Sequence, residues 1–341
     1  SVHVRQRAPG LTRGPAHQTA SRAKCEGGRM AAARPGAGAA AEAFRALVQV
    51  RRSARAFQRE DAAGLAAAKA AACEALALAQ RSPSGWNLQP YRAVLVQDSH
   101  VKGQLAHAMV GGNIRRVLEA PVTVVWLADV KPWRLIEDAV RLERQNGAMS
   151  EIQLAALASD ARFMLGGFGG DHSDLPSSSV AQQPKPGSSN VVGEFLKHRG
   201  PDFSAAEGAA NAVEQSLKRS LLSLLSEVTQ APTINASAEA WAFKNTMLAV
   251  QSYLLGMEAL GFQSCPMEGF DARRAMKAIS APASRFSVPI VTSSGVAADV
   301  KPGEAEYESS QSLRPRFDFE DVFCQDSFDF PLVRQDRDAA D

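Results

Sequence analysis

Apolar residues recur every three or four positions in four stretches of the chain, which is the spacing of an amphipathic helix. These stretches are Ala43–Arg51, the alanine-rich Ala62–Gln80, Trp133–Met164 and the longest, Ala238–Leu260. Gly261 directly follows the last stretch, and glycine is common just beyond a helix end because it adopts left-handed backbone angles without strain. The pattern therefore predicts four helical regions.

Shorter apolar runs rich in valine lie between the helical stretches. Ala93–Val96, Val122–Ala128 and Val288–Thr292 have this composition, which favours buried strands. Cys265–Asp271, directly after the longest helical stretch, is interpreted as a loop. Helices and strands are therefore predicted to alternate along the chain.

The composition is that of a globular protein, since 45% of the 341 residues are hydrophobic and 22% are charged. The four cysteines are scattered without a C-x-x-C pair, which is too sparse for a disulfide framework or a zinc site and favours a reducing compartment. No stretch reaches the roughly 18 uncharged apolar residues of a membrane helix. We therefore expect a soluble intracellular protein without a metal site or a membrane partner, in the cytoplasm or in an organelle such as a mitochondrion or plastid.

Charge is distributed unevenly along the chain. Residues 1–40 hold seven Lys or Arg and one Glu, whereas the rest holds 31 bases and 35 acids. The mildly acidic body lacks the basic surface that is typical of nucleic-acid binding. The basic leader matches an organelle transit peptide in composition, and alternatively Met30 is the native start and residues 1–29 are not translated. On either interpretation residues 1–40 are excluded from the fold.

Residues 41–326 are expected to form one domain with an insertion. A stretch rich in Gly, Pro and Ser covers about residues 166–208, and a bare loop of this length is uncommon in a compact domain. It is interpreted as an insertion, a lid or a disordered segment. Gly166–Gly170 lacks the spacing of a phosphate-binding loop and is assigned to this segment. The acidic and aromatic residues 327–341 are expected to form a C-terminal tail.

Two arginine-rich segments lie near opposite ends of the chain. They are Arg51–Phe57, with the sequence RRSARAF, and Leu313–Phe317, with the sequence LRPRF. Planar guanidinium groups close to a hydroxyl suit a phosphate dianion. Each segment alone is weak evidence, because basic helix ends are common and usually solvated.

Two turn segments offer groups that suit the edge of a polar ring. In Ser82–Pro90, with the sequence SPSGWNLQP, Asn87 and Gln89 supply both donors and acceptors. In Cys265–Asp271, with the sequence CPMEGFD, Gly269 permits a close approach of the backbone. Each of these segments alone is also compatible with ordinary turn chemistry.

Taken in order, the four segments resemble the FMN-dependent nitroreductase family. The shared motifs are R-R-S-x-R-x-F, P-S-G-x-N-x-Q-P, an Ala-Pro strand opening at Ala120, A-L-G-x-x-x-C-P-x-E-G-F-D and a terminal R-x-R. The resemblance covers about residues 42–325 without the insertion. It implies an α+β fold, in which helices flank a central, mostly antiparallel sheet, and an intertwined homodimer with FMN at the interface.

The resemblance also implies which residues bind the cofactor. The group at the FMN phosphate and ribityl chain is Arg51, Arg52, Ser53, Arg314 and Arg316. The group at the pyrimidine edge of the flavin is Arg55, Asn113 and Arg116. The group that reaches the flavin of the partner subunit is Pro83, Ser84, Gly85, Asn87 and Gln89. The loop over the flavin N5 contributes Pro266, Glu268 and Gly269.

The activity implied by the resemblance is a ping-pong hydride transfer. NAD(P)H would reduce the flavin, and a nitroaromatic, a quinone or a similar electrophile would then be reduced at the same face. No side chain must act as acid or base in the first half, so no catalytic residue is nominated. Two alternatives stay open: a specialised enzyme of the family, such as a dehalogenase or an oxidase of heterocycles, and a non-catalytic flavin-binding protein. Residues 131–238 align poorly with the family, so the substrate is not predicted.

Overall fold

The computed structural model describes residues 37–165, 237–303 and 314–333. The predicted insertion at 166–208 and most of the predicted leader lie outside these residues. The chain divides into two units between Ala46 and Leu47, and each is described by itself. Helix α1 (Ala37–Val50) begins in the first unit and confirms the predicted helix near Ala43–Arg51, although it starts before residue 40. The fold below is that of the second unit.

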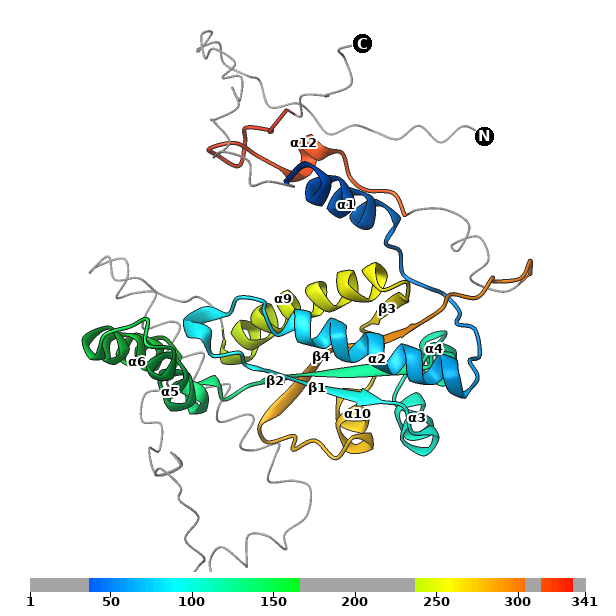
Figure 1. Ribbon diagram of the computed structural model, residues 1–341, viewed down its shortest axis with the longest axis horizontal. Coiled ribbons are helices and arrows are strands. Elements are labelled where there is room, and N and C mark those ends of the chain that lie inside the picture. Colours follow the sequence, from blue (N-terminus) through cyan, green and yellow to red (C-terminus); the bar gives the residue numbers. More distant parts are fainter. Residues whose placement is uncertain (1–36, 166–236, 304–313, 334–341) are drawn as a thin grey trace, which may run out of the picture. The chain divides into compact units, whose positions relative to one another are not determined.

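The core of the second unit is a four-stranded antiparallel sheet with the strand order β1-β2-β4-β3 (Figure 1). The strands are β1 (Tyr91–Val96), β2 (Val122–Asp129), β3 (Gln263–Met267) and β4 (Phe286–Gly295). All residues of β2 are buried, as expected for a central strand covered on both faces. The sheet confirms the predicted α+β class and the predicted strands β1, β2 and β4.

Strand β3 corrects the sequence interpretation, which made Cys265–Asp271 a loop from its first residue. Cys265 and Met267 are instead paired with β4, opposite Ser293 and Val291. The strand was missed because it is short and contains Pro266, which cannot donate a hydrogen bond. Since β3 is an edge strand, the proline is tolerated there, and the loop begins only after Met267.

Helices cover both faces of the sheet (Figure 1). Helices α2 (Ala62–Ala79) and α9 (Ala238–Ala259) pack against each other on one face, where their side chains meet those of Val124 and Trp126. The opposite face packs against α3 (Ser99–Ala106), α4 (Asn113–Glu119) and α10 (Ala272–Ala278). Both predicted helices α2 and α9 are confirmed, and Gly261 has the left-handed φ of +84° expected beyond a helix end.

Helix α2 is long and apolar enough to cross a membrane by length and composition alone. Its hydropathy comes mainly from alanine, and it also carries Lys69 and Glu74. Ala72 and Ala75 on one face of α2 are fully buried against α9. A Cβ added at Gly256 of α9 would lie only 3.2 Å from the Cβ of Ala75, so the two helices cross in close contact.

The predicted helical region Trp133–Met164 consists of three helices. They are the 3₁₀ helix η2 (Pro132–Leu135), α5 (Ile136–Asn146) and α6 (Glu151–Leu165). The chain turns between α5 and α6 at Gly147, whose φ of +71° favours glycine. The resulting hairpin shares a hydrophobic cluster with Leu88 and with Trp241 of α9.

Residues 314–333 contain one short helix, α12 (Phe319–Val322). Their aromatic side chains are largely exposed, with Phe317 at 85% and Phe328 at 92%. The exposure of these rings distinguishes the segment from the core elements of the sheet.

Candidate functional site

The predicted phosphate-binding segment Arg51–Phe57 runs beside the edge strand β3 and the end of β4. The backbone N–H of Ala54 donates to the carbonyl of Ser264 across 3.2 Å, and Gln58 N–H donates to the carbonyl of Val296 across 2.9 Å. Ala54, Ala56 and Phe57 are buried, whereas Arg51, Ser53 and Arg55 are half-buried and Arg52 is exposed. The sheet therefore fixes the backbone of this segment and leaves the polar side chains accessible.

Glu258, near the end of α9, is a residue that the motifs did not identify. Burial raises the pKa of its carboxyl above the ordinary value, while the positive charges of Arg51 and Arg52 oppose that rise. A hydrogen bond from Gln263 at the start of β3 also opposes the rise. The only sequence signal was a single acid within an otherwise apolar part of the helix, and it did not reveal that the charges of two arginines act on this acid.

The predicted ring-edge residues Asn113 and Arg116 meet the loop that follows β3. Asn113 Nδ2 donates to the carbonyl of Gly269 across 3.2 Å, and Val110 N–H donates to the same carbonyl across 3.0 Å. Arg116 is buried, and its Nη1 donates to Asn113 Oδ1 across 2.6 Å. The structure thus brings together residues from two of the predicted cofactor-binding groups, the ring-edge group and the loop over the flavin N5, and Arg116 orients the Asn113 amide.

The other residues of this loop differ in position. Glu268 and Gly269 are exposed, and at Gly269, which has no side chain, the exposed surface is backbone. Pro266 lies within β3 opposite Thr292, and it therefore belongs to the strand that leads into the loop. An added Cβ at Gly269 would lie 3.1 Å from Asn113 Nδ2, which is closer than ordinary contact.

The turn Pro83–Gln89 adopts a backbone conformation that is rare for its residues. Trp86, Asn87 and Gln89 have φ values of 50°, 54° and 47°. Non-glycine residues in this region are strained, and such strain persists only where surrounding contacts hold it. The turn is therefore held in place by the elements around it.

Contacts with α9 and within the turn provide this support. The backbone N–H of Gly85 donates to Asn245 Oδ1 across 2.8 Å, and Gln89 N–H donates to Ser84 Oγ across 2.9 Å. The ring of Trp241 lies so close to Gly85 that an added Cβ would be 2.8 Å from it. The sequence analysis did not identify Asn245 and Trp241, because an amide and an aromatic ring in a long helix are ordinary core residues.

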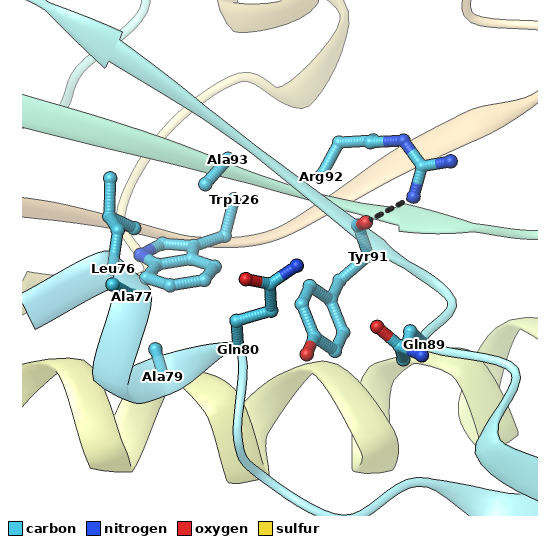
Figure 2. Close-up of a pocket in the computed structure, with 9 residues that line it drawn as sticks. All are labelled: Leu76, Ala77, Ala79, Gln80, Gln89, Tyr91, Arg92, Ala93 and Trp126. Carbon is cyan, nitrogen blue, oxygen red and sulfur yellow. Dashed lines mark hydrogen bonds between the residues drawn. The ribbon is translucent and has the colours of Figure 1, made fainter. Parts of the chain in front are cut away.

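A pocket of about 390 Å³ adjoins this turn between the end of α2 and the edge strand β1 (Figure 2). In Figure 2 the Gln80 carboxamide lies between the rings of Trp126 and Tyr91. The hydroxyl of Tyr91 is buried without a hydrogen-bond partner among the described residues, and burial raises the pKa of this phenol, which stays neutral. The pocket therefore combines two aromatic rings with the neutral polar groups of Gln80 and Tyr91. The remaining lining residues, which include the charged Arg92, are Leu76, Ala77, Ala79, Gln89, Arg92 and Ala93.

Arg314 and Arg316 are exposed. The Arg316 guanidinium donates to the backbone carbonyls of Arg314 and Pro315, at 3.2 and 3.0 Å. Residues 304–313, which connect them to the sheet, lie outside the described part of the chain. A phosphate site that combines these arginines with Arg51 therefore stays a prediction.

Comparisons of sequence confirm the family resemblance drawn from the motifs. Residues 203–292 match the model of the nitroreductase family. A Thermus thermophilus protein named NADH dehydrogenase is 38% identical over 96 residues, which are 26% of this chain and 46% of that protein. The match thus spans about half the length of this relative.

Comparisons of structure show the nitroreductase-like fold. A protein of Bacillus subtilis named as a nitroreductase has a TM-score of 0.50 at 18% identity, over 84% of this chain and 99% of its own. A Staphylococcus epidermidis protein named as an NAD(P)H:FMN oxidoreductase has a TM-score of 0.51 at 15% identity, over 82% of this chain and 94% of its own. At these identities the similarity establishes the architecture.

Proposed function

We propose that this chain, whose resemblance to the nitroreductase family is confirmed by sequence and fold, is a flavin oxidoreductase that binds FMN and takes hydride from NAD(P)H. The acceptor is a nitroaromatic, a quinone or a similar small electrophile. The observation that carries the proposal is the contact between Asn113 and the Gly269 loop, because residues of two groups assigned to the flavin meet there.

The side chains present fit a flat heterocycle with a phosphate. Arg51 and Arg52 carry two positive charges beside one carboxyl, that of Glu258, whose burial disfavours its negative charge. A phosphate dianion would therefore meet a site of net positive charge. At the ring end, Gly269 offers an exposed backbone without a side chain to keep a ring at a distance.

Each residue then has a defined role toward the cofactor. FMN, when bound, would supply the ring that accepts a hydride and passes it on. Arg55 and Asn113 would bind the polar edge of that ring, and positive or N–H groups there stabilise its reduced, anionic form. Arg116 would keep the Asn113 amide oriented through its hydrogen bond to Oδ1. No side chain has to donate a proton during hydride uptake, so no catalytic residue is assigned.

The separation of the motifs within one chain supports a homodimer. The turn Pro83–Gln89 leads into β1, whereas Arg51–Phe57 runs beside β3, and these strands are the two edges of the sheet. Neighbouring strands lie about 4.8 Å apart, so four strands place the edges roughly 14 Å apart. A turn that contacts a flavin from the β1 edge is therefore expected to contact the flavin of a second copy.

The visible absorption spectrum of the purified protein, before and after NADPH is added without oxygen, tests the proposal. A flavin spectrum that NADPH or NADH bleaches supports an oxidoreductase. Colourless protein that takes up no added FMN would overturn the assignment. Bound flavin that neither nucleotide bleaches would point instead to a non-catalytic flavin-binding protein.

A panel of acceptors then separates the two enzymatic alternatives. Turnover of several nitro or quinone compounds supports a general reductase. Bleaching by NAD(P)H with no turnover of any of these compounds would favour a specialised enzyme that acts on one metabolite.

A further inference from the structure

A chain of side-chain hydrogen bonds joins the turn Pro83–Gln89 to helix α5. Asn87 Nδ2 donates to Glu143 Oε1 across 2.6 Å, although 56 residues separate them in the sequence. Gln89 Nε2 in turn donates to Asn87 Oδ1 across 3.1 Å. Glu143 is therefore the end of a network that includes both amide side chains of the turn.

The chemistry of these groups fixes the orientation of the Asn87 amide. An ionised carboxylate can only accept hydrogen bonds, so the nitrogen of Asn87 must face Glu143 and the oxygen must face away. The oxygen is then the atom that accepts from Gln89. A bond to a charged acceptor is also shorter and stronger than one between neutral groups. One carboxylate thus sets which atoms of Asn87 and Gln89 are left for other partners.

The backbone of the turn makes this support necessary. Asn87 has a φ of 54°, and its neighbour Trp86 has a φ of 50°. Gly85 N–H is held from the other side by Asn245 of α9. The strained turn is therefore fastened at two points, by α9 at its start and by α5 at its centre.

We propose that Glu143 is a positioning residue for the site, which holds Asn87 and Gln89 in the orientation that contacts the flavin of a second copy. The inference rests on the proposed function, because it assigns the turn to the flavin. Glu143 lies in none of the motifs that carry the resemblance and outside residues 203–292, which match the family model, so the sequence did not indicate it. Helix α5 thereby takes part in the site without touching the cofactor.

The proposal is tested by titrating FMN into the full-length apoprotein of the wild type, Glu143→Ala and Glu143→Gln. The quenching of flavin fluorescence measures the binding. Glu143→Ala removes the acceptor and is expected to weaken FMN binding about tenfold, which corresponds to the loss of one charge-assisted bond. Glu143→Gln keeps an acceptor oxygen and is expected to restore most of the affinity. The visible spectrum of the bound flavin should differ from wild type only for Glu143→Ala.

Asp138→Ala is the matched control, because it removes one negative charge from the same helix. Asp138 pairs with Arg141, three residues away on the same helix, at 2.8 Å. Wild-type affinity is expected for this variant. A tenfold loss in Asp138→Ala as well would assign the effect to the charge of α5 and overturn the positioning role.

The remaining outcomes separate this inference from the proposed function. Wild-type protein that binds no FMN overturns both. Wild-type protein that binds FMN, together with unchanged affinity in Glu143→Ala, overturns the positioning role alone. A lower melting temperature without a change in affinity does the same, since it leaves only a structural role. If Glu143→Ala does not fold, Asn87→Ala removes the bond from the other side, and unchanged FMN affinity there also overturns the proposal.

Discussion

The side-chain amide of Asn113 donates to the backbone carbonyl of Gly269 across 3.2 Å, although 156 residues separate the two along the chain. This bond joins the first turn of α4 to the loop that follows β3. It is also the point at which two residue groups of the proposed flavin site meet. A side chain at Gly269 would crowd the Asn113 amide that makes this bond, and the effect of such crowding can be tested.

Gly269→Ala is expected to weaken FMN binding several-fold and to lower the free energy of unfolding by about 1 kcal/mol. The added Cβ would lie 3.1 Å from Asn113 Nδ2 and force the amide to move. Gly103→Ala is the control, because its Cβ would meet no atom within 4 Å and alanine favours a helix. FMN titration and thermal melts measure both variants, and equal behaviour of the two would contradict the assignment.

Arg51→Ala and Arg316→Ala are each expected to weaken FMN binding by about 1 to 3 kcal/mol, since each removes a charge-assisted bond to the phosphate. Arg274→Ala, an exposed arginine on α10, serves as the control. Flavin content after dialysis measures the effect. Full flavin retention in both test variants would contradict the predicted phosphate site.

Lys102→Met is expected to stabilise the protein at neutral pH by about 1 kcal/mol. Lys102 is buried, and its Nζ donates to the carbonyl of Ala120. Burial lowers the pKa of its amine below the ordinary value of 10.5, so the unfolded chain binds this proton more tightly than the folded protein. The free energy of unfolding of the wild-type protein should therefore increase as the pH rises through the lowered folded pKa toward 10.5.

The pH dependence of urea unfolding checks this prediction. The difference in free energy of unfolding between Lys102→Met and the wild type should decrease as the pH rises, because the variant lacks the titrating amine. An advantage that is constant with pH would mean that packing, and not the buried charge, causes the difference.

Gly256→Val is expected to lower the free energy of unfolding by about 1 to 3 kcal/mol, because overpacking forces closely packed elements apart. The Cβ would lie 3.2 Å from the Ala75 Cβ and 3.3 Å from its Cα, and backbone at this distance cannot yield without moving α2. Gly103→Val is the control, because it makes the same change in helix propensity at a position where an added Cβ would meet no atom within 4 Å. Denaturant melts that give equal losses would contradict a close crossing of α2 and α9.

The sequence alone was sufficient for the elements whose pattern is local. Helices α2 and α9 were predicted from their helical spacing of apolar residues, and strands β1, β2 and β4 from short valine-rich runs, and both signals are contained in each segment. Strand β3 was not predicted, because Pro266 argues against a strand and because this strand depends on its pairing with β4. Only the order of the motifs along the chain indicated that distant segments contribute to one binding site.

Contacts that build the candidate site were decided by the tertiary structure. The sequence named Asn113 and Asn87, but it could not place Gly269 beside the first or Glu143 beside the second. Nor could it show that the charges of Arg51 and Arg52 act on Glu258. Each of these relationships joins segments that are far apart along the chain, so no local pattern carries it. It arises only when the pairing of strands and the packing of helices bring the segments together.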